Sequence, residues 1–195
     1  ACQGIDRVAI VDIGTGEIDN IDIDYSSMSG MADTPHFIVI DEINRYWFVT
    51  TIMSGYVGCY NLDTDEFIDT IKVGDAPALM VLNETSKKLY VSRMMPMGGM
   101  GAVSNVVQEI DYSDPTNMNA SNEYAVDSPA PHGLAINSDG SEVYVSSNTA
   151  DWLYKIIPGT TDEPDGVVMD VSYDNSPDYP IQRLKPIQCV SVDDS

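Results

Sequence analysis

The sequence predicts an all-β protein made of one repeated unit, and three copies that align without a gap are the main observation. Each copy has a proline, an apolar strand, a polar turn opened by Asp or Asn, then an aromatic residue, Val and Thr or Ser. The copies occupy residues 35–50, 77–92 and 131–146, and a fourth begins at Ile187. Their starts lie 42, 54 and 56 residues apart. A four-stranded propeller blade takes about 40–45 residues. We therefore predict a β-propeller of four-stranded antiparallel blades, about three of them complete, with partial blades at both ends.

Each part of the repeated unit has a local physical reason. The proline fixes φ at the start of a strand, where no donor of the hydrogen-bond ladder is lost. The Asp or Asn opens a tight turn because its side chain can bond nearby backbone groups. Continuous apolar runs, as in residues 47–49 and 89–91, are typical of strands buried on both faces, as in stacked blades. Further strand pairs are predicted at residues 56–63 with 67–73 and at 8–12 with 18–23.

The register of the repeat divides the chain into blades. Residues 1–30 form the outer half of a blade, and residues 185–195 supply the first strand of another. Complete blades are predicted at residues 31–73, 74–126 and 127–184, the last two with insertions. Two explanations of the partial blades stay open. The chain is a piece of a longer propeller, or its last strand completes the first blade of a small closed ring without free sheet edges.

The match to a known repeat is carried by Val-Gly-Asp-Ala-Pro at 73–77 and by aromatic-Val-Thr/Ser triplets at 48–50, 90–92 and 144–146. With these motifs, nearly the whole chain resembles the YVTN family of β-propellers, which is related to the seven-bladed lactonase-like and quinoprotein-like group. That family has Asn after its Val-Thr pair, where this chain has Thr51, Arg93 and Ser147. The resemblance implies seven blades in a complete ring, so it favours the longer propeller.

The charge of the chain excludes some partners. It has 31 Asp and Glu against 9 Lys and Arg, a net charge of −22. Such a surface repels nucleic-acid phosphates and anionic membranes, and it suits cations and basic partners. No apolar run approaches the about 20 residues of a membrane-spanning helix. Cys2, Cys59 and Cys189 are too few and too scattered for a disulfide framework or a zinc site.

Two histidines are the first candidate site. His36 and His132 follow the proline of their copies, where the first strand of a blade lines the central channel; Ala78 and Gln188 hold the same position elsewhere. Two imidazoles at a channel mouth could bind a ligand or a metal such as copper, or act as general acid and base. Gln188 and Arg93 are further candidates for this site. The alternative is that they are hydrogen-bonding turn residues.

Methionines and acids give weaker candidates. Met94, Met95, Met97 and Met100 lie in an insertion and form an adaptable contact loop, or a soft site for Cu(I). Clusters of acids such as Asp19, Asp22 and Asp24 offer oxygen ligands to Ca²⁺, or form a solvated strand face. No cofactor is otherwise predicted.

Two functions remain open at this stage. The first is a non-catalytic binding or scaffold module of an exported or cell-surface protein, with a protein or small ligand as partner. The acidic surface, the inserted loops, the lack of catalytic motifs and the YVTN resemblance favour it. The second is a propeller enzyme or metalloprotein of the lactonase, quinoprotein or copper type, with a channel site that includes His36 and His132. A fold of this kind hosts many functions and does not choose between them.

Overall fold

The computed structural model is all-β in the residues that it describes, which are 1–25, 30, 32–74, 76–95, 105–126, 130–148, 152–160 and 163–168. Fourteen strands in these ranges form four antiparallel sheets, one of two strands and three of four. The predicted class is confirmed. In the same ranges, no helix is long and apolar enough to cross a membrane. The strand predicted at Ile187 lies outside the described residues.

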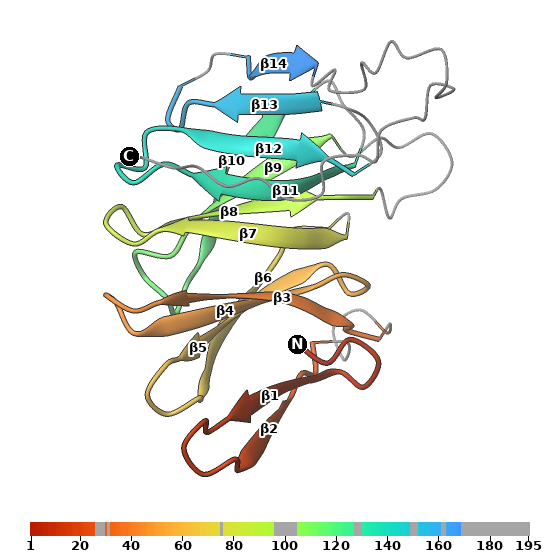
Figure 1. Cartoon of the computed structure of the whole chain (residues 1–195), viewed down its shortest axis with the longest axis vertical. Coiled ribbons are helices and arrows are strands. Elements are labelled where there is room, and N and C mark those ends of the chain that lie inside the picture. The colour runs from red at the N-terminus through yellow and green to blue at the C-terminus, as the bar shows by residue number, and fades with distance from the viewer. Residues whose placement is uncertain are drawn as a thin grey trace, which may run out of the picture.

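The sheets follow one another in chain order, from β1 at one end of the molecule to β14 at the other (Figure 1). The short sheet pairs β1 (Arg7–Val11) with β2 (Ile18–Asp22). The second contains β3 (Pro35–Asp41), β4 (Tyr46–Thr51), β5 (Tyr56–Asn61) and β6 (Phe67–Lys72). The third contains β7 (Pro77–Asn83), β8 (Lys88–Arg93), β9 (Val106–Asp111) and β10 (Asn119–Ala125). The fourth contains β11 (Pro131–Ile136), β12 (Val143–Ser147), β13 (Trp152–Ile156) and β14 (Asp165–Val168).

In each full sheet the strands lie in sequence order, and the first strands contact one another. β7 contacts β3 and β4, and β11 contacts β7 and β8. β3, β7 and β11 are therefore the inner strands, and β6, β10 and β14 are the outer ones. This arrangement explains why second and third strands such as β4 and β5 are buried along nearly their whole length.

The hydrophobic core consists of three clusters, one in each seam between successive sheets. Phe48 and Met80 belong to the cluster between the second and third sheets, and Tyr90 and Leu134 to the one between the third and fourth. Val8 of β1 packs with Trp47 in the first seam. Burial between faces, and not within one sheet, is therefore what holds the sheets together.

In two of the seams, a hydroxyl group of the repeat donates a hydrogen bond to the next sheet. Each first strand has a register shift after its proline. The Oγ1 atom of Thr50 accepts a hydrogen bond from the Phe37 amide at this irregularity, 3.1 Å, and donates one to the Ala78 carbonyl of the next sheet, 2.8 Å. In the same way, Ser92 Oγ accepts from the Leu79 amide and donates to the His132 carbonyl, 2.8 Å. We call these two bonds between sheets the hydroxyl bridges.

The third copy shows what a hydroxyl bridge needs. Ser146 holds the position of Thr50 and Ser92, and it is 1% exposed. Among the described residues, its Oγ atom has no hydrogen-bond partner. By the register of the other copies, its acceptor would be the carbonyl of Gln188, which lies outside the described residues.

Candidate functional site

One face of the protein carries the starts of all three inner strands. Each proline pairs with the last residue of the second strand of its sheet. The pairs are Pro35 with Thr51, Pro77 with Arg93, and Pro131 with Ser147. The residues directly after β4, β8 and β12, which are Ile52, Met94 and Asn148, therefore lie on the same face as His36 and His132. We call this the histidine face.

The structure brings the two predicted histidines together. Their ring centroids lie 6.3 Å apart, with the rings edge to face at 65°. Both side chains are half-buried. Ala78 holds the same position on β7, the strand between them, and its short, fully buried side chain leaves room for the two rings to approach.

Burial lowers the pKa of His36, and the neighbouring His132 lowers it further because two positive imidazoles repel each other. His36 is therefore neutral at pH 7. A neutral imidazole offers one hydrogen-bond donor and one acceptor nitrogen, and the acceptor can also bind a metal. The pair is suited to binding more than to holding positive charge.

Replacing His132 by glutamine is expected to raise the pKa of His36, because the substitution removes the neighbouring imidazole whose positive charge disfavours a second one. Titration of the His36 ring signals by NMR measures the change. A His36 pKa that stays the same in His132→Gln would show that burial alone sets it.

Of the other predicted site residues, the structure describes Arg93, Met94 and Met95. Arg93 starts from the histidine face, but its guanidinium pairs with Glu123 of the outer strand β10, so it is directed away from the inner strands. Met94 is half-buried and its sulfur accepts a hydrogen bond from Asn148, 3.7 Å, while Met95 is 45% exposed. Met97, Met100 and Gln188 lie outside the described residues.

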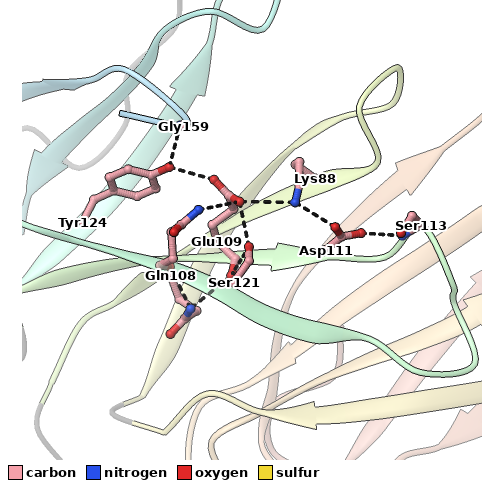
Figure 2. Close-up of polar contacts among 9 residues, drawn as sticks. Lys88, Gln108, Glu109, Asp111, Ser113, Ser121, Tyr124 and Gly159 are labelled. Carbon is pink, nitrogen blue, oxygen red and sulfur yellow. Dashed lines mark hydrogen bonds and ion pairs between the residues drawn. The ribbon is translucent and has the colours of Figure 1, made fainter. Parts of the chain in front are cut away.

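Sequence reasoning missed a buried carboxylate in the third sheet. Glu109 of β9 is 3% exposed, and donors surround it (Figure 2). The Tyr124 hydroxyl donates to Glu109 Oε2, 2.7 Å, and the Ser121 hydroxyl donates to Oε1, 2.7 Å. Asn122 also donates to Oε1, 3.1 Å, and Lys88 lies 3.4 Å away.

The Glu109 network connects two sheets. Burial by itself raises the pKa of Glu109, but the hydrogen bonds from Ser121, Tyr124 and Asn122, with Lys88, hold it below its usual value. The Tyr124 hydroxyl in turn accepts the amide of Gly159, in the turn between β13 and β14. The side chains that bind this carboxylate come from the third sheet, and Tyr124 links them to the fourth sheet through Gly159. The network therefore stabilises the seam between these two sheets. The only hint of this network in the sequence was a Glu within a strand segment. Comparison of the copies did not reveal it, because Cys59 and Lys155 occupy the positions equivalent to Glu109.

The described ranges contain no group of three or more His, Cys, Asp or Glu side chains placed to hold a metal ion. Asp22, one of the predicted calcium ligands, instead pairs with Arg7 on the exposed surface of the short sheet. The two histidines remain the candidate for a ligand site.

Comparison with known proteins defines the class of fold. The chain is similar to the β-propeller domain of Cps50 (Swd1) from Myceliophteria thermophila, with a TM-score of 0.63 and 15% identity over 85% of this chain and 54% of that one. It is similar to a 6-phosphogluconolactonase-like protein from Bacteroides uniformis, with a TM-score of 0.65 and 14% identity over 86% and 49%. A chain in the mitotic checkpoint complex gives a TM-score of 0.64 and 14% identity over 84% and 44%.

These likenesses show the fold alone: the protein is built of β-propeller blades. The chain spans about half the length of the three structures. No protein-family description and no curated protein sequence matches it.

Proposed function

We propose that this chain is a non-catalytic binding module of the YVTN-like propeller type, part of an exported or cell-surface protein, and that it binds its partner through the histidine face. The observation that carries the proposal is the meeting of His36 and His132 on the face from which the β8–β9 loop also starts. The net charge of −22 favours a partner with a basic surface.

The buried carboxylates support a binding role because they act within the seams. Asp41 accepts hydrogen bonds from Asn44 and from the Tyr112 hydroxyl of the next sheet, 2.8 Å. Glu109 is fully engaged as described above. These groups stabilise the contacts between sheets, so we assign recognition to the two imidazoles and to the segment that begins at the exposed Met95.

Deleting residues 96–104 from the β8–β9 loop tests the proposal. A partner cross-linked to the purified protein is expected to be lost on deletion and to be bound more weakly by the double variant His36→Ala/His132→Ala, because the loop and the imidazoles share one face. A deletion within an exposed turn of the opposite face, at residues 13–15, is the matched control. Capture that survives the loop deletion, or that fails equally with the control, would contradict the proposed surface.

A second candidate, a metal site in the hub, is favoured by the spacing of the two rings. A metal–nitrogen bond takes about 2.0–2.1 Å, so a centroid spacing of 6.3 Å suits one ion held by a nitrogen of each ring once the rings turn from their edge-to-face arrangement. Other blades of a longer propeller would supply further ligands.

Titration of the purified protein with Zn²⁺ and with Cu(I) distinguishes this candidate. A hub site gives one ion per chain, and His36→Ala/His132→Ala lowers the affinity at least 100-fold, while Met94→Leu/Met95→Leu leaves it within a factor of three. Equal binding by all three proteins would rule out the hub as the metal site.

A further inference from the structure

Among the described residues, one edge of the short sheet has no neighbouring strand. There, β1 pairs with β2 on one side only. At the start of its other edge, Cys2 forms an isolated antiparallel bridge with Arg7. In the second sheet the equivalent pair is Thr51 with Tyr56, the last pair of the ladder between β4 and β5. β1 therefore corresponds to the third strand of a four-stranded sheet. Of its pairing with a second strand, only the pair next to the turn, Cys2 with Arg7, is present among the described residues.

An apolar cleft of about 290 Å³ lies beside this edge. Its lining comes from β1, β3, β4 and the turn after β5: Val8, Ala9, Ile10, Ile38, Ile40, Trp47, Leu62 and Asp65. Ile40 is 50% exposed, whereas its equivalents in the repeat, Leu82 and Ile136, are partly buried. An apolar cleft along an unpaired strand edge is a place where another strand can add.

The other two seams show what covers the equivalent surface. There, the second strand of the preceding sheet supplies an aromatic side chain, Phe48 in one seam and Tyr90 in the other. The same strand supplies the hydroxyl bridge, from Thr50 to the Ala78 carbonyl and from Ser92 to the His132 carbonyl. In the first seam, the described residues on the short-sheet side come from β1 and β2 and the segment after it.

We infer that the β1 edge and this cleft form the seat of a β-hairpin with the chemistry of the chain's own repeat. The outer strand of the hairpin pairs with β1 in line with the bridge between Cys2 and Arg7, and its inner strand covers Ile38 and Ile40. An aromatic residue of its aromatic-Val-Thr/Ser triplet fills the cleft, and the hydroxyl of that triplet donates to the carbonyl of His36. The occupant is thus recognised by backbone pairing, one aromatic ring and one hydroxyl group.

A hairpin of known sequence tests the inference. A copy of residues 77–91 is joined directly before residue 1, and Ala1→Ser restores the hydroxyl of the triplet. The extended chain is expected to melt at least several degrees higher, and hydrogen exchange at the β1 amides that face away from β2 is expected to slow at least tenfold. The matched control has the same extension with the copied tyrosine replaced by aspartate.

Ile40→Asp in both backgrounds separates seating of the hairpin from general stabilisation. In the natural chain Ile40 is half exposed, so the melting temperature is expected to fall by less than about 2 °C. In the extended chain it is expected to fall by at least about 4 °C, because the aspartate is then buried against the hairpin. An equal fall in the two backgrounds would overturn the inference. So would a dimer of the natural chain that Ile40→Asp dissociates, because the seat would then belong to a second copy.

Discussion

Replacing Glu109 by leucine is expected to lower the free energy of unfolding by about 3–5 kcal/mol, the range observed when one partner of a buried charged network is removed. The carboxylate is 3% exposed and accepts from Tyr124, Ser121 and Asn122, with Lys88 alongside. Without it, these buried donors lose their acceptor. Urea unfolding followed by tryptophan fluorescence measures the loss.

The control for this substitution is Glu123→Gln on the neighbouring strand. Glu123 pairs with Arg93, but its side chain is 58% exposed, so we expect a loss of no more than about 1 kcal/mol. Comparable losses at the two positions would show that the network around Glu109 adds little stability.

Acid gives an independent check on Glu109. Its pKa is lowered in the folded protein, so its contribution is complete above the usual value of 4.5 and is lost as the pH falls through the lower folded value. The difference in stability between the natural protein and Glu109→Leu is therefore expected to be constant near neutral pH and to shrink on acidification below about pH 4. A difference that grows with acid would contradict this sign.

Removing a hydroxyl bridge is expected to have the second-largest effect. Ser92→Ala leaves the His132 carbonyl and the Leu79 amide without this partner in a buried seam, at a cost of about 1–3 kcal/mol. Ser146→Ala removes an equally buried hydroxyl that has no partner among the described residues, so its effect is expected to stay within about 0.5 kcal/mol.

The comparison of these two serines is sharp because they occupy one position of the repeat and lose the same atom. Urea unfolding of the two variants measures the difference directly. Equal losses would mean that the hydroxyl stabilises its own strand, and not the contact between sheets.

The repeat in the sequence was enough to predict the strands, because alternating prolines, turns and apolar runs are local signals. The strand predicted at residues 56–63 forms as β5, and the one at 67–73 forms as β6. Their common repeat position placed His36 and His132 at the start of inner strands, but a role in ligand binding stays a prediction. Their ring spacing could not be predicted, because it depends on how closely β3, β7 and β11 pack.

Other features leave no trace in the sequence. Thr34, Ala76 and Ala130, which precede the three prolines, have φ values of 53°, 51° and 52°, a left-handed conformation that the sequence would assign to glycine. Their carbonyls accept the amides that follow the second strands, as in the bond from Ile52 to Thr34. Contacts across the sheet, and not the residue type, impose this backbone conformation.

The hydroxyl bridges end on main-chain carbonyls, which every amino acid possesses. The bond to Ala78 needs nothing from the alanine methyl group, and the bond to His132 needs nothing from its imidazole. The four copies accordingly hold His, Ala, His and Gln at this position. The hydrogen bonds that join the sheets therefore do not depend on which side chain stands at this position. The side chain can be exchanged in one blade at a time without removing a bond between sheets.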